Sequence, residues 1–329
     1  FMWQAVTRTS RKYQLSAQIT SFVPLDDPME IMYVEITNTG NMQVRFTPTA
    51  AIPVYGRSAD NLRDHRHVTS LLHRIKTSEN GVICKPVLSF DERGHQKNNM
   101  IYYVAGSTEN GENPVSFFPT VASFIGESGT FLAPEALAKN QKGCGAGKEF
   151  AGEEALGAMT FAEIMLAPGQ AREYIVVSGM TESEEEITRT AEAFHTKEQA
   201  DAAFIKAKEY WNGLVNISFE TGNPKEDSYL KWICFQPILR RIYGCSFLPY
   251  HDYGRGGRGW RDLWQDYLTL LLQNPMRVRS VFVHNMKGVR LDGSNATIIL
   301  DGEGNFQADR NKISRVWMDH GVWPLFTLL

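Results

Sequence analysis

The stretch MYVEITNTGNMQVRFTP, residues 32–48, decides the fold class. Residues 32–37 alternate between apolar and polar side chains, residues 38–41 are typical of a turn, and residues 44–48 return to the extended pattern. This order predicts a β-hairpin in which Gly40 adopts a positive φ angle.

A similar pattern recurs further along the chain. Residues 162–166 and 172–177 have strand-like alternation and flank a Pro-Gly turn at residues 167–170, so a second hairpin is expected there. Strands that carry one apolar and one polar face, with turns between them, indicate an antiparallel β-sandwich. We assign this sandwich to residues 1–180.

Helical patterns replace the strands after that point. Thr181 can cap a helix whose first turn holds four glutamates, and Thr196 can cap a second helix with Gln199 in the capping-box position. We therefore predict a helical linker over residues 181–225. Residues 226–329 form a third, helical region, in which Pro237 should kink or break the first helix.

Composition and charge limit the class of function. The chain has 329 residues, with 34 Lys and Arg against 37 Asp and Glu, which gives a formal net charge of −3. Non-specific nucleic-acid binding needs excess basic charge, so this balance excludes it. No apolar stretch is long enough for a membrane span and no signal peptide opens the sequence, so we expect a cytoplasmic protein without membrane contacts. The apolar ending Trp323–Leu329 and the start at Phe1 favour a piece of a longer chain.

The run WRDLWQD, residues 260–266, contains the first group of candidate functional residues. Asp262 and Asp266 are four residues apart and therefore share a helix face, where they repel each other unless Arg261, Arg258 or a ligand separates them. One hypothesis is that these groups hold sugar hydroxyls. The alternative is a capped helix start followed by a solvated second acid.

The run RVWMDHGVWP, residues 315–324, contains the second group. Asp319 lies among Trp317, Met318 and Trp323, and partial desolvation there should raise its pKa. A carboxyl group that is still protonated near neutral pH can give its proton to a leaving glycosidic oxygen. Inverting hydrolysis needs a second carboxylate to activate water, whereas a phosphorylase needs cationic or N–H groups that hold phosphate.

Two further motifs have simpler explanations. The run YGRGGRG, residues 253–259, resembles an RNA-binding tract, but a single short copy in a near-neutral chain favours a loop beside a pocket. His65 and His67 share a strand face without an obvious third ligand, so packing is favoured over a metal site. We expect no metal site.

Several stretches together resemble the inverting glycoside phosphorylases of glycoside hydrolase family 94, which include cellobiose, chitobiose and β-1,2-oligoglucan phosphorylases and a region of cyclic β-1,2-glucan synthases. They follow the order of that family and comprise residues 55–70, 116–120, 259–266 and 317–324. The resemblance implies an N-terminal antiparallel β-sandwich, a helical linker and, over residues 226–329, the first part of an (α/α)6 catalytic barrel.

The resemblance also implies roles for individual residues. Asp319 would be the general acid, and the substrate would be bound by Arg261, Asp262, Asp266, Arg258, Trp317, His320 and Trp323. The chain has Met318-Asp319-His320 where the cellobiose phosphorylases have a Ser-Asp-Asp-type run, so Asp319 acts either alone or with His320. No organic cofactor is implied; inorganic phosphate is the co-substrate, and two copies would pair through the sandwich.

The leading hypothesis is inverting phosphorolysis of β-linked gluco-oligosaccharides, which yields α-glucose 1-phosphate. The alternatives are an inverting glycoside hydrolase and a non-catalytic carbohydrate-binding module. Because the phosphate-binding residues of the family lie beyond Leu329, we expect this part of the enzyme to be inactive alone.

Overall fold

The computed structural model describes the chain except for residues 56–69, 92–93, 244–257, 301–305 and 308–317. The chain divides into two compact units, the first Met2–Glu209 and the second Tyr210–Leu329 together with Phe1. The boundary between the units falls within the predicted linker.

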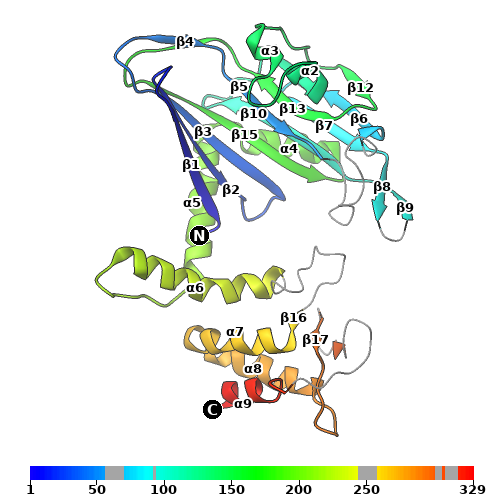
Figure 1. The fold of residues 1–329 in the computed structure, drawn as a ribbon, viewed down its shortest axis with the longest axis vertical. Coiled ribbons are helices and arrows are strands. Elements are labelled where there is room, and N and C mark those ends of the chain that lie inside the picture. Colours follow the sequence, from blue (N-terminus) through cyan, green and yellow to red (C-terminus); the bar gives the residue numbers. More distant parts are fainter. Residues whose placement is uncertain (56–69, 92–93, 244–257, 301–305, 308–317) are drawn as a thin grey trace. The chain divides into compact units, whose positions relative to one another are not determined.

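A large antiparallel sheet forms the framework of the first unit (Figure 1). Its strands, in their order across the sheet, are β1 (Trp3–Ser10), β2 (Leu15–Phe22), β3 (Met29–Asn38), β15 (Ala171–Thr181), β10 (Ile101–Thr108), β7 (Gly81–Pro86), β6 (His73–Thr77) and β12 (Glu149–Ala151). The strands that alternation predicted in this half of the chain are therefore confirmed.

A smaller sheet packs on one face of the large sheet. It consists of β11 (Ser116–Thr120), β13 (Ala155–Thr160) and β5 (Thr49–Pro53), with the short helices α2 (Val121–Ile125) and α3 (Glu135–Ala138) beside it. The core between the sheets includes Val104 and Val176 from the large sheet and Phe117 and Met159 from the small one. This is the expected antiparallel sandwich. Two strand pairs complete the unit: β4 (Val44–Phe46) with β14 (Ile164–Leu166), and β8 (Leu88–Asp91) with β9 (Gly94–Lys97).

The two predicted hairpins are wrong, although their strands exist. Strand β3 does not pair with β4; it pairs with β15, while β4 pairs with β14. The segment that contains β3 and β4 therefore lies antiparallel to the segment that contains β14 and β15. Each strand pairs with a strand of the other segment, and not with its neighbour in the sequence. Alternation identifies an extended segment, but it carries no information on which segment lies beside it.

Asn38 holds the corner where the two segments change sheets. It is fully buried, and its Nδ2 donates to the carbonyl oxygens of Met42 and Leu166 at 2.8 and 2.9 Å. Its Oδ1 accepts the N–H of Gly40 at 2.9 Å. The opposite corner is the expected Pro-Gly turn, in which Gly169 has a φ of 74°.

Gly40 does not adopt the positive φ that we predicted. A side chain is excluded there for another reason, because an added Cβ atom would lie 2.3 Å from the Oε1 atom of Gln14. The glycine permits a close approach of two chain segments rather than an unusual backbone angle.

Replacing Asn38 with Ala should destabilise the first unit by roughly 3 kcal/mol, because three hydrogen bonds are lost and the carbonyl oxygen of Leu166 stays buried without its partner. Chemical denaturation measures the change. Asn41→Ala, on the exposed neighbouring surface, serves as the control and should change the stability by less than about 0.5 kcal/mol. Equal effects of the two substitutions would contradict the role of Asn38.

Two helices cover the other face of the large sheet. Helix α4 (Glu184–Ala193) is capped by Ser183 and not, as expected, by Thr181, whose hydroxyl donates to Glu186 at 2.7 Å. The hydroxyl groups of Tyr103 and Thr190 lie 3.0 Å apart and join α4 to the sheet.

Helix α5 (Lys197–Gly213) follows, with Gln199 in the expected capping-box contact with the N–H of Thr196. Its first residue, Lys197, forms a 2.8 Å ion pair with Glu173 of β15. The start of α5 is therefore fixed to the centre of the large sheet.

His73 should make the first unit sensitive to acid. It is 3% exposed, and burial lowers its pKa, although the carbonyl oxygen of Glu153 and the charge of Glu154 oppose this shift. As the pH falls below about 6.5, the unfolded chain takes up a proton that the folded chain still rejects, so stability falls. His73→Gln should flatten the slope of stability between pH 7 and pH 5, as measured by denaturation; an unchanged slope would contradict this.

The second unit is mainly helical. Its helices are α6 (Pro224–Tyr243), α7 (Trp260–Gln273), α8 (Pro275–Asn285) and α9 (Val322–Leu328), with a short 3₁₀ helix η1 (Met286–Gly288) and the strands β16 (Arg258–Gly259), β17 (Ile298–Ile299) and β18 (Phe306–Gln307). Helix α6 continues through Pro237, so the expected break does not occur. The core gathers around Trp260, Trp264 and Tyr267 of α7. That these helices are the first part of an (α/α)6 barrel stays a prediction.

Candidate functional site

Two segments predicted to share a site meet at the start of α7. The Nη1 atom of Arg261 lies 3.2 Å from Oδ2 of Asp319, and the indole Nε1 of Trp323 donates to the same oxygen at 3.3 Å. Asp319 and Arg261 are separated by 58 residues in the sequence, so the fold creates this contact. Both side chains are partly exposed to solvent.

The pKa of Asp319 is lowered, whereas we had predicted that it would be raised. Desolvation does raise it, but the hydrogen bonds from Arg261 and Trp323 and the positive charge of Arg261 outweigh that contribution. The indole of Trp323 acts as a hydrogen-bond donor as well as an apolar surface, and Met318 is 96% exposed. In this arrangement Asp319 is ionised at neutral pH.

Asp266 is buried and paired, not directed toward solvent. Its two carboxylate oxygens accept hydrogen bonds from Nε and Nη2 of Arg240 on α6, at 2.5 to 2.9 Å. Its pKa is raised by burial, although Arg240 acts in the opposite direction. Arg240 was not predicted from the sequence, because no spacing within α6 shows which of its residues will face α7.

Asp262 and Arg258 differ in how far they are available to a ligand. Asp262 is partly exposed, and its Oδ1 lies 4.0 Å from Nε of Arg261. The Nη2 atom of Arg258 donates to the carbonyl oxygen of Arg241, which holds the end of α6 near β16. The predicted ligand Trp317 lies outside the described residues, as do His65 and His67.

His320 is buried beside Asp319. The indole Nε1 of Trp260 donates to its carbonyl oxygen at 3.0 Å, and Nδ2 of Asn295 lies 3.1 Å from its ring Nδ1. Burial lowers the pKa of His320. The site therefore combines an ionised carboxylate, a guanidinium group, an accessible second carboxylate and an indole ring within the second unit.

Comparison with known proteins identifies the first unit. The sequence profile of the glycosyl hydrolase 94 supersandwich domain matches residues 3–197. The chain belongs to glycosyl hydrolase family 94. This is a family of carbohydrate-active enzymes, and the resemblance predicted from the four motifs is confirmed. A search of curated proteins gave no significant match.

A solved structure shares the fold of this family-94 chain. A bacterial glucoamylase in complex with acarbose superimposes with a TM-score of 0.51 and 11% identity, over 98% of this chain and 44% of the glucoamylase. A protein described as a kojibiose phosphorylase from the human microbiome has a TM-score of 0.42 and 9% identity, over 90% of this chain and 36% of its own. The chain thus spans less than half the length of either protein.

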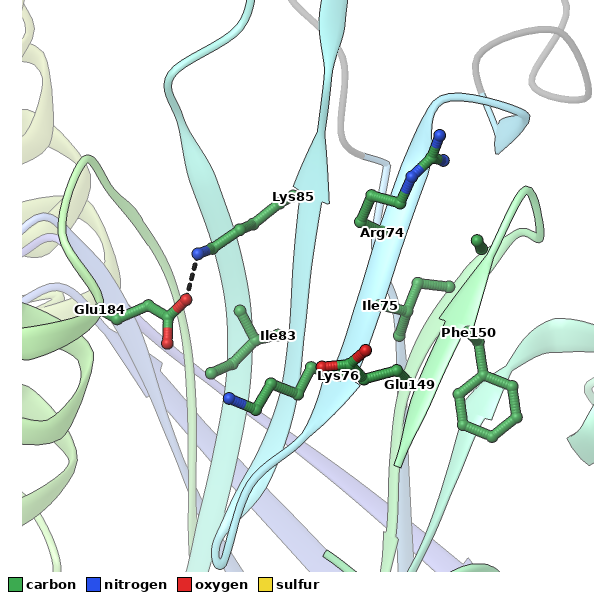
Figure 2. A pocket seen from close by; sticks show the side chains of 9 residues that line it. Arg74, Ile75, Lys76, Ile83, Lys85, Glu149, Phe150 and Glu184 are labelled. Atoms are coloured by element: carbon green, nitrogen blue, oxygen red, sulfur yellow. Dashed lines mark hydrogen bonds and ion pairs between the residues drawn. The ribbon is translucent and has the colours of Figure 1, made fainter. Parts of the chain in front are cut away.

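The supersandwich domain has a depression of its own, of about 450 Å³, which sequence analysis did not predict. Figure 2 shows it on the face of the large sheet where β6, β7 and β12 approach the first turn of α4. Lys85 of β7 is paired with Glu184 of α4, and this hydrogen bond lowers the pKa of Glu184. The pair joins α4 to the sheet.

The described residues contain no group of three or more His, Cys, Asp or Glu side chains arranged to hold a metal ion. No helix among them is long and apolar enough to cross a membrane.

Proposed function

We propose that the protein catalyses inverting phosphorolysis of β-linked gluco-oligosaccharides, with release of α-glucose 1-phosphate. The observation that carries the proposal is the meeting of Asp319 with Arg261 and Trp323 at the start of α7. Membership of family 94 supports a reaction on a glycosidic bond.

Asp319 is the general acid in this proposal. It would donate a proton to the glycosidic oxygen as phosphate attacks the anomeric carbon from the opposite face. The contact with Arg261 keeps Asp319 ionised, so a bound substrate must draw the guanidinium group away before Asp319 can carry a proton. In the reverse reaction the ionised form is the useful one, because it accepts the proton of the attacking sugar hydroxyl.

The remaining residues divide into two groups. Asp262, Arg261 and Trp323 are exposed enough to contact a sugar ring, with carboxylate and guanidinium groups on hydroxyls and the indole on C–H surface. Asp266 fixes the orientation of α7 through Arg240 instead of contacting the sugar freely. No step in this scheme requires a metal ion or an organic cofactor.

The test uses the full-length protein. It is incubated with β-linked gluco-oligosaccharides with and without inorganic phosphate, and the products are followed by ³¹P NMR. Phosphate-dependent formation of α-glucose 1-phosphate is expected. Equal cleavage without phosphate would instead indicate an inverting hydrolase, and glucan binding without any cleavage would indicate a carbohydrate-binding module.

A further inference from the structure

His320 is buried, whereas the residues before and after it in the sequence are exposed to solvent. Its exposed fraction is 5%, whereas the side chain of Asp319 before it is 40% exposed and Gly321 after it is also exposed. Buried polar groups are almost always hydrogen-bonded, so the partners of His320 determine where this segment lies.

Among the described residues, two side chains from other parts of the second unit contact His320. The carbonyl oxygen of His320 accepts the indole N–H of Trp260, the first residue of α7. The Nδ2 atom of Asn295 donates to the carbonyl oxygen of Ala296 at 2.6 Å and lies 3.1 Å from Nδ1 of the His320 ring. The contact with Ala296 fixes the orientation of the Asn295 amide group. If the amide were rotated by half a turn, its oxygen would face the carbonyl oxygen of Ala296.

The contact with Asn295 defines the tautomer of His320. Since the amide nitrogen only donates, Nδ1 accepts and the ring proton lies on Nε2. Burial favours this neutral ring, although the charges of Asp319 and Asp262 favour the protonated form and that of Arg261 opposes it. The ring is therefore a fixed hydrogen-bond acceptor.

We propose that His320 is a positioning residue that holds the carboxyl group of Asp319 in place by anchoring its segment to Trp260 and Asn295. The inference rests on the proposed function of Asp319. The N–H groups of Val322 and Trp323 both point to the carbonyl oxygen of Asp319, at 3.1 and 3.4 Å. The turn that begins at Asp319 therefore moves together with His320.

The first experiment compares two substitutions in the complete protein. Asn presents its Oδ1 close to the position of the histidine Nδ1, so His320→Asn keeps the bond to Asn295, while His320→Leu removes it. We expect His320→Leu to lower kcat for glycosidic cleavage by about 10²-fold, as a displacement of about 1 Å can. The KM for phosphate should not change, and His320→Asn should restore most of the lost kcat.

Tyr267→Phe is the matched control. The hydroxyl of Tyr267 accepts a 3.1 Å hydrogen bond from Asn285 in the same unit, and both residues are buried. The substitution removes one buried hydrogen bond without touching the segment of Asp319. It should lower the unfolding temperature about as much as His320→Leu and leave kcat unchanged.

The outcomes distinguish this inference from the proposed function. If the unmodified protein cleaves its substrate and His320→Leu retains kcat, or if His320→Asn loses as much kcat as His320→Leu, the positioning role is overturned while the proposed function stands. If the unmodified protein cleaves no glycosidic bond, with or without phosphate, both are overturned.

Discussion

Replacing Asp319 with Asn should lower the rate of phosphorolysis by about 10²–10⁴-fold, which is the usual contribution of a positioned general acid. Asn has nearly the same shape, and its Oδ1 can still accept hydrogen bonds from Arg261 and Trp323, so the fold should be retained. The loss would then reflect the missing proton. Steady-state release of glucose 1-phosphate by the complete protein measures the effect.

The leaving group provides the control for this substitution. A substrate with a nitrophenyl leaving group departs without protonation, so Asp319→Asn should cost much less activity on it than on an oligosaccharide. Full activity of the variant on oligosaccharides would show that Asp319 is not the general acid. An equal loss on both substrates would point to damaged binding instead.

Replacing Arg240 with Met should destabilise the second unit by about 3–5 kcal/mol, because it leaves the buried carboxylate of Asp266 without its partner. Urea denaturation followed by tryptophan fluorescence reports on this core, which contains Trp260 and Trp264. Lys225→Met, at an exposed position of the same helix, should have little effect.

The destabilisation should depend on pH in a defined direction. Without Arg240 the pKa of Asp266 in the folded state rises further above its value in the unfolded chain. The folded variant then binds a proton that the unfolded chain releases, so its stability falls as the pH rises. We expect a larger loss at pH 8 than at pH 5, and the double variant Arg240→Met/Asp266→Leu should recover part of it. A loss independent of pH would contradict this account.

Local sequence patterns predicted where the strands and helices lie better than they predicted which of them pair. Alternation located the strands around residues 32–37 and 172–177, and the capping pattern of Thr196 and Gln199 located the start of α5, because both signals depend on neighbouring residues alone. The pairing of β3 with β15 and of β4 with β14 was not predictable, because the partner strands lie about 130 residues away in the sequence.

The candidate site shows the same limit. Sequence motifs named Arg261 and Asp319, which the fold brings within 3.2 Å. The direction of the pKa shift was wrong, because the tryptophans next to Asp319 are visible in the sequence while the guanidinium group that reaches it from α7 is not. Arg240 was missed for the same reason: the helix that supplies a counter-charge is selected by packing.

Strand β15 also constrains the order in which the first unit can form. It lies between β3 and β10, and it is the last strand of the large sheet to be synthesised. A nascent chain that stops before residue 171 would hold β1–β3 and the β10–β7–β6 group as two separate ribbons with open edges, which invite aggregation. The supersandwich therefore closes late on the ribosome, and truncations within its last strand should be recovered as insoluble protein.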